Sequence, residues 1–151
     1  VFEHLLDPAE VLAECHRLLR AGGQLILAVP NIDSWQARWS GTEWFHLDVP
    51  RHIYHYSPAT LSRLLRAHGF EIERISHQNQ EQNPFGLLQS ALHRIGRPYY
   101  GLYDMLKGKG GRRLLAFGLY LMAFPMATLI SALAAAWGSG ATFTVHARRM
   151  G

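Results

Sequence analysis

Apolar and polar positions follow two different periods along the first thirty residues. After Asp7-Pro8, apolar side chains recur at the spacing of one helix face: Val11, Leu12, Cys15, Leu18 and Leu19. Asp is a good N-cap, Pro suits the first helical position, and Gly22-Gly23 suits the helix end. Residues 24–30 form a continuous apolar run, which predicts a strand buried on both faces. Helix, glycine turn and strand make half of a βαβ unit.

The same two periods continue further along the chain. A second helix is predicted from Ser57-Pro58 to Gly69, with apolar positions at Leu61, Leu64 and Leu65. Residues 70–75 alternate in the manner of a strand with one solvated face, and residues 142–147 predict a final strand. Between these strands, helical patterns cover residues 85–95 and 99–106.

Residues 114–137 contain 24 positions without one charged side chain. At about 1.5 Å per residue, one helix of this length could cross a bilayer. The flanking strands are expected to share a sheet, so the chain must return, and Pro125 predicts a break into a helical hairpin. This hairpin would dip into one leaflet or be covered by protein, including a second copy. Lys107, Lys109, Arg112 and Arg113 precede it, where anionic headgroups would lie.

Composition narrows the class of protein. Hydrophobic residues make up 48% and charged residues 17%, which is typical of a folded domain. The single cysteine, Cys15, excludes an internal disulfide and favours the cytoplasm. The net charge of +4 is scattered outside residues 107–113, which lack interleaved aromatic residues, so no nucleic acid is expected as a partner. We expect a cytoplasmic protein, peripheral at the inner membrane face.

Four segments in this order resemble the second half of class I S-adenosylmethionine-dependent methyltransferases of the UbiE/UbiG-like, type 11/23 group. They are Phe2-Glu3-His4-Leu5 with Asp7-Pro8, residues 18–31, Trp44 to His52, and residues 57–70. The resemblance covers about residues 1–78 and the last strand. It implies an α/β fold: the C-terminal half of a Rossmann-like methyltransferase sheet with a hydrophobic helical insertion between the last two strands. Residues 24–29, 70–76 and 142–148 would be strands five, six and seven, with the last two antiparallel.

The resemblance also divides the chain and points to what it does not contain. Residues 1–78 would belong to the methyltransferase core, 79–140 to the apolar insertion, and 141–151 to the final core strand. In the family, a glycine-rich loop after the first strand and an acidic residue ending the second hold the cofactor. Gly108 to Gly111 follows no buried strand and is not that loop. We therefore expect a fragment that is inactive by itself.

Cofactor contact is assigned by the resemblance to Phe2, Glu3 and His4, which would follow the fourth strand. The alternative for Glu3 and His4 is a solvated helix-entry turn. Some relatives bind a divalent metal through a Glu-His pair here, but the sequence shows no convincing set of further oxygen ligands, and no metal is expected. Asn31, at the end of strand five, either contacts the acceptor or caps the turn.

The long segment from Asn31 to Ser57 holds most of the candidate chemistry. Because histidine titrates near neutral pH, His52 is the first candidate for a catalytic base and His46 the second. The alternative for His52 is a hydrogen bond that orders the loop. Acceptor contacts are predicted for Trp44, Arg51 and Tyr54, although the tryptophans of this segment could equally form its own small core.

These observations predict methyl transfer from S-adenosylmethionine to an oxygen, less readily a carbon, of an apolar or lipid-linked acceptor. A membrane surface is the expected partner of residues 107–137, and a homodimer is the competing one. The alternative function is a non-catalytic membrane-anchoring or dimerising remnant of such an enzyme. A glycine-rich loop after a buried strand upstream would favour the enzyme.

Overall fold

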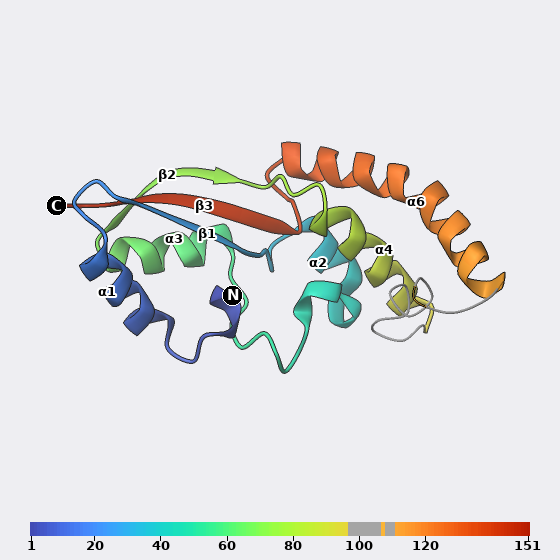
Figure 1. Ribbon diagram of the computed structural model, residues 1–151, viewed down its shortest axis with the longest axis horizontal. Coiled ribbons are helices and arrows are strands. Elements are labelled where there is room, and N and C mark those ends of the chain that lie inside the picture. The colour runs from blue at the N-terminus through green and yellow to red at the C-terminus, as the bar shows by residue number, and fades with distance from the viewer. Residues whose placement is uncertain (97–106, 108–110) are drawn as a thin grey trace.

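The computed structural model describes residues 1–96, 107 and 111–151, and for residues 111–116 it describes the backbone alone. Three strands, β1 (Gln24–Pro30), β2 (Phe70–Ser76) and β3 (Thr142–Arg149), form one sheet in the order β1-β3-β2. β3 runs antiparallel to both neighbours, so β1 and β2 are parallel to each other (Figure 1). The predicted antiparallel pairing of the last two strands is confirmed.

Two helices, α1 (Pro8–Leu18) and α3 (Pro58–Ala67), cover one face of the sheet (Figure 1). Both begin where the sequence predicts. The Asp7 carboxylate accepts hydrogen bonds from the first turn of α1, and Ser57 and Thr60 form a reciprocal capping box at the start of α3. These caps satisfy backbone N–H groups that have no partner within the helix, which sets the first residue of each helix.

The main core lies between these two helices and the sheet. Its fully buried side chains come from the helical and strand positions predicted to face inward: Leu12, Leu61, Leu65, Phe70, Phe143 and Val145. The opposite face of the sheet is open in the described chain. There Ile26 is 54% exposed, and Glu73 accepts a hydrogen bond from Gln24 and pairs with Arg148. The sheet therefore buries one face and presents a mixed one.

Between β2 and β3 the chain forms two helices, α4 (Gln82–Arg94) and α6 (Gly111–Ala136), which pack side by side beyond the end of the sheet (Figure 1). The helix predicted over residues 85–95 is α4, whereas the one predicted over 99–106 lies outside the described residues. The family-like fold and the helical insertion are thus both present. The exact bounds of the three predicted chain divisions stay a prediction.

The predicted break at Pro125 is wrong. Pro125 lies inside α6, which bends but does not reverse (Figure 1). Proline removes one hydrogen bond, here to the carbonyl of residue 121, and its ring crowds that carbonyl. Leu121 is 55% exposed, so the affected turn of α6 lies at the surface. One lost hydrogen bond there does not prevent a continuous helix that packs against α4.

The segment between β1 and α3 is folded into short helices. α2 (Trp35–Ser40), η2 (Gly41–Glu43) and η3 (Phe45–Leu47) pack against α4. Asn83 joins this layer to the sheet: its Oδ1 accepts from the backbone N–H and the hydroxyl of Thr142, and its backbone oxygen accepts from the side chain of Gln36. The insertion is therefore anchored where β3 begins.

Candidate functional site

A cavity of about 310 Å³ opens at the carboxyl end of β1. Its wall combines ionisable and apolar side chains, among them Glu3, Asp48, His52, Val29, Phe45 and Phe85. The carboxyl ends of strands are where open α/β sheets bind ligands. The sequence predicted its site at this edge, and the structure places a cavity there.

Glu3 reaches the cavity through η1 (Phe2–His4), the short helical turn that precedes α1. Its backbone oxygen accepts hydrogen bonds from the N–H groups of Ile53 and Tyr54, at 2.9 and 3.2 Å, which ties the turn to the segment after His52. Phe2 points the other way: it is 4% exposed and its ring lies 5.4 Å from that of Tyr56 in the core. Of the residues predicted to contact cofactor, Glu3 lines the cavity, whereas Phe2 and His4 are not among its lining residues.

Asp48 positions His52. Asp48 adopts a left-handed conformation (φ 41°) after η3, and its backbone oxygen accepts from the N–H groups of Arg51 and His52. Asp is among the few residues that tolerate this conformation. The resulting tight turn brings the carboxylate of Asp48 to 3.8 Å from His52 Nε2. Residues 48 to 52 thus form one unit whose backbone places an acid beside an imidazole.

The two ring nitrogens of His52 have different environments. Nδ1 lies 2.7 Å from the backbone oxygen of His46. A carbonyl oxygen can only accept, so Nδ1 carries the hydrogen, and in the neutral ring Nε2 has the free lone pair. Nε2 lies 3.8 Å from Glu3 Oε1 and 3.8 Å from Asp48 Oδ2. This arrangement is that of a base whose protonated form would meet two carboxylates.

His4 repeats this arrangement. Its Nδ1 lies 2.8 Å from the backbone oxygen of Arg51, and its Nε2 lies 3.8 Å from Glu3 Oε1. One ligand atom from each of Glu3, His4 and His52 lies within 4.8 Å of the others, which is the spacing of a candidate cation site. Histidines that bind metals commonly donate their second nitrogen to a carbonyl, as both do here. The expectation that no metal acts here stays a prediction.

His46 is placed differently from His52. It is 7% exposed, and burial lowers its pKa from 6.5 to about 4, with the nearby charge of His52 as a second cause. A β-carbon on Gly86 would lie 2.5 Å from its Nε2, so α4 closes directly over the ring. His46 therefore stays neutral near pH 7 and supports His52 through its backbone oxygen. His46 also lines the cavity, but its Nε2 is buried against Gly86 of α4.

Burial alone would raise the pKa of Glu3. A hydrogen bond from its own backbone N–H and the charge of His52 act in the opposite direction and lower the pKa. Glu3 is therefore ionised near neutral pH. Together with Asp48 it makes the polar side of the cavity an acceptor-rich surface.

The predicted acceptor-binding residues have different environments in the structure. Asn31 is 1% exposed and uses its side chain within the fold: Nδ2 donates to the oxygen of Gly140, and Oδ1 accepts from the N–H of Asp33. Trp44 is also buried, at 1%. Arg51 forms an ion pair with Asp48 at 2.7 Å, and the Tyr54 hydroxyl donates to the oxygen of Leu6. The contacts of Asn31 fit a residue that caps the turn after β1. Arg51 lies beside the cavity and pairs with Asp48, which lines it.

Part of the cavity wall was not found from the sequence. Asn79, Gln82 and Phe85 line it from the start of the insertion. Phe85 packs edge-on against Phe45, with ring centroids 5.4 Å apart. These residues lie outside the segments that resemble the family, and no local pattern marks them. The one sequence signal that could have indicated Phe85 is its position as an apolar residue in the first turn of the helix after β2.

The chain is similar in sequence to known methyltransferases. Residues 1–75 match a family model described as a methyltransferase domain. The chain belongs to the class I S-adenosylmethionine-dependent methyltransferases. It is 33% identical over 82 residues to a ubiquinone biosynthesis O-methyltransferase of Thiobacillus denitrificans, covering 50% of this chain and 35% of that protein. It is 37% identical over 76 residues to a probable S-adenosylmethionine-dependent methyltransferase of Mycolicibacterium smegmatis, covering 48% of this chain and 26% of that protein.

The fold comparison agrees with this membership. The crystal structure of the cyclase SpnF aligns over 99% of this methyltransferase chain and 47% of its own length, with a TM-score of 0.50 and 16% sequence identity. This likeness extends through the insertion and concerns the fold alone. The chain spans about a third of the length of the curated relatives it matches.

The family's cofactor is S-adenosylmethionine, a sulfonium cation. The anionic pair Glu3 and Asp48 fits the neighbourhood of such a cation, and Glu3 lies on the turn that precedes α1. The described residues contain no glycine-rich loop between a buried strand and a helix, and no acidic residue that ends a neighbouring parallel strand. The acidic residues that line the cavity therefore fit a cofactor that carries a positive charge.

Proposed function

We propose that this chain supplies the acceptor side of an S-adenosylmethionine-dependent methyltransferase, with His52 as the general base for an oxygen acceptor. One observation carries the proposal. The hydrogen bond from Nδ1 to the backbone oxygen of His46 leaves the Nε2 lone pair beside Glu3 and Asp48 in the cavity. A base in a fixed tautomer beside two carboxylates favours proton removal from a hydroxyl.

His52 Nε2 would accept the proton of the acceptor hydroxyl as the oxygen takes the methyl group. The cofactor, when bound, would supply that methyl group and would keep the electron pair of the carbon–sulfur bond, so protons and electrons balance. Glu3 and Asp48 stabilise the imidazolium that results, because opposite charges at this distance interact favourably in a partly buried site.

The apolar part of the wall supports an apolar or lipid-linked acceptor. Val29, Phe45 and Phe85 line the same cavity as the ionisable groups, so an acceptor with one hydroxyl and an apolar body would contact both kinds of side chain. The relative named as a ubiquinone biosynthesis O-methyltransferase supports oxygen over carbon as the atom methylated.

Replacement of His52 tests the base. In the complete enzyme, His52→Ala should lower kcat by roughly a hundredfold while cofactor affinity changes little. His68→Ala is the matched control, because His68 also places Nδ1 2.8 Å from a backbone oxygen but lies at the end of α3. If both variants turn over like the wild type, and His52→Ala only lowers the melting temperature, His52 is a structural residue.

Cofactor binding tests the proposal that the nucleoside side lies elsewhere. Titration calorimetry of the 151-residue chain with S-adenosylmethionine should show very weak binding. A low-micromolar dissociation constant, about −8 kcal/mol, would mean that these residues complete the pocket and that this part of the proposal is wrong.

A second candidate function is favoured by the exposed apolar surface of α6. A non-catalytic remnant that anchors to a membrane or dimerises would need this surface and not the cavity. Methyl transfer by the complete gene product separates the two. Transfer that depends on His52 excludes the remnant, and absence of transfer to phenolic acceptors with and without alkyl chains supports it.

A further inference from the structure

The side chains of α6 are distributed in the opposite way to those of an ordinary surface helix. The positions it buries are small: Ala127, Ser131 and Ala135 are 2%, 4% and 9% exposed. Its large apolar residues point outward, with Met122 80% and Met126 59% exposed. A helix that covers a water-soluble protein buries its large residues. This helix approaches α4 closely through small residues and presents the large ones to its surroundings.

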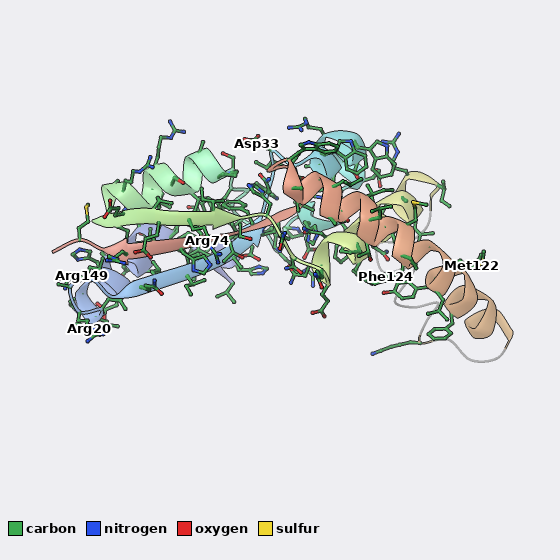
Figure 2. All side chains as sticks on the ribbon, turned by 90° about the horizontal axis from the view of Figure 1, so that it is seen from above. Arg20, Asp33, Arg74, Met122, Phe124 and Arg149 are labelled. Carbon is green, nitrogen blue, oxygen red and sulfur yellow. The ribbon has the colours of Figure 1, made fainter. Side chains whose placement is uncertain are left out.

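The exposed apolar surface is long. Residues Phe117–Ala136 form a helix long and apolar enough to cross a membrane by length and composition, and 17% of its most apolar part is buried. Figure 2 shows Met122 and Phe124 on the half of α6 far from the sheet, at the end of the molecule opposite Arg20 and Arg149. Because apolar patches of this extent are unfavourable in water, a second surface must cover this face.

Tryptophan and arginine residues border the end of α6 nearest the sheet. Trp35, Arg38, Leu133 and Trp137 line an apolar groove of about 350 Å³, and Trp137 is 79% exposed. The ring of Trp35 stacks on that of Trp39 at 5.8 Å. The guanidinium of Arg94 lies 5.1 Å from the Trp39 ring. Tryptophan and arginine are favoured where hydrocarbon meets polar headgroups, since each has an apolar body and a polar tip.

Charge is divided between the two parts of the chain. Residues 1–81 contain seven Lys or Arg and ten Asp or Glu, whereas residues 82–151 contain eight Lys or Arg and one acidic residue, Asp104. The half that carries the exposed apolar helix is therefore strongly positive. An anionic surface complements this charge. A symmetric dimer through the same face would instead bring two positive halves together.

We propose that the outward face of α6, together with the groove of Trp35 and Trp137, docks on an anionic lipid surface, with the helix lying in the interface. α6 does not span the bilayer in this arrangement. It packs along α4, and its last residue, Ala136, leads within six residues into β3 of the core sheet. Docking of this kind is strengthened by apolar burial and by basic residues near the headgroups. The proposal is independent of methyl transfer.

Vesicle binding by the 151-residue chain tests the proposal. Sedimentation with vesicles of phosphatidylglycerol and phosphatidylcholine should exceed sedimentation with phosphatidylcholine alone, and high salt should weaken it. Met122→Glu should reduce binding at least tenfold. Leu18→Glu is the matched control, because Leu18 is 67% exposed on α1, on the covered side of the sheet. Both positions are exposed, so both variants should keep the wild-type circular dichroism spectrum.

Tryptophan fluorescence gives a second readout. Brominated lipids should quench the tryptophan fluorescence of the wild type. They should quench that of Trp137→Phe less, because Trp137 is the most exposed of the tryptophans. Equal binding of Met122→Glu and Leu18→Glu would overturn the proposal. Failure of the wild-type chain to bind anionic vesicles at low salt would also overturn it. If light scattering shows a dimer that is lost in Met122→Glu, the outward face of α6 binds a second copy instead. Vesicle binding by His52→Ala should be normal, which separates this test from that of the proposed function.

Discussion

The chemistry of His52 is set by what each of its ring nitrogen atoms faces. A backbone oxygen fixes the hydrogen on Nδ1, and two carboxylates lie near Nε2. His4 has the same arrangement toward Glu3. At the scale of single residues, the site is therefore an acceptor-rich cluster with free imidazole lone pairs. Such a cluster can take a proton or a cation, and the two uses compete.

This competition gives a prediction for added Zn²⁺. If His52 is the base, Zn²⁺ held by Glu3, His4 and His52 removes the lone pair, so it should inhibit methyl transfer, and EDTA should restore it. Glu3→Gln should weaken this inhibition because one anionic ligand is lost. Steady-state rates with and without Zn²⁺ decide the matter. Activation by Mg²⁺ or Zn²⁺ would instead identify the cluster as a metal centre.

The buried ring of His46 predicts a pH dependence of stability. Its pKa falls from 6.5 to about 4 on folding, so the unfolded chain binds the proton more tightly. Stability should therefore be lost as pH falls from about 6.5 to about 4, by up to about 3 kcal/mol. Denaturant unfolding of the wild type and of His46→Gln across this range measures it. A difference between the two proteins that does not change with pH would contradict the prediction.

At the scale of elements, the insertion is held by polar groups at its base and by small side chains along its length. Asn83 is 1% exposed and bonds to the start of β3, to α2 and, through Nδ2, to the backbone of His77. Ala127 and Ser131 let α6 approach α4. Each element is thereby placed by a few buried contacts, while the large apolar residues of α6 remain on its surface.

Asn83→Ala should destabilise the chain by about 3 kcal/mol. The substitution leaves a buried Thr142 hydroxyl and backbone N–H without an acceptor, and each such loss costs about 1–3 kcal/mol. Asn79→Ala is the control. Asn79 is half-buried, and its Oδ1 accepts hydrogen bonds from the N–H groups of Glu81 and Gln82 at the start of α4, so its loss should cost about 1 kcal/mol. Equal midpoints of urea unfolding for the two variants would show that Asn83 does not anchor the insertion.

At the scale of the whole molecule, the sheet of the described chain is open on one face and along both of its edges, β1 and β2. β1 is an edge strand in the described chain, and Ile26 lies on its open face. An edge strand with apolar exposed positions is a template for pairing with another chain. The described part of the molecule therefore has two surfaces that favour association: this side of the sheet and the outer face of α6.

These two surfaces should be separable. Ile26→Lys should reduce concentration-dependent self-association of the 151-residue chain, measured by light scattering, without lowering its stability, because Ile26 contributes to no buried core. Vesicle binding should be unchanged. Self-association that persists in Ile26→Lys and disappears in Met122→Glu would assign it to α6.

The sequence by itself determined those features that depend on local chemistry. Asp7 and Ser57 mark where these helices start, since caps are satisfied within a few residues. Gly69 marks the end of α3, whereas α1 already ends at Leu18, before the predicted Gly22-Gly23. The apolar run of residues 24–30 and the alternation from Phe70 set the strands. The family resemblance then ordered the strands, including the antiparallel last pair. His52 and Glu3 were named because residue type and position after a strand already indicate chemistry.

Tertiary structure alone decided what depends on contacts between distant residues. The tautomer of His52 follows from a backbone oxygen six residues away. The orientation of His4 in the cluster depends on its hydrogen bond with the backbone oxygen of Arg51, which lies 47 residues away in sequence. The burial of Phe2 and Asn31, and the cavity wall from Phe85, depend on packing that no local period encodes. Pro125 failed as a predictor for the same reason. One lost hydrogen bond competes with the packing of an entire helix, and only the fold shows which is larger.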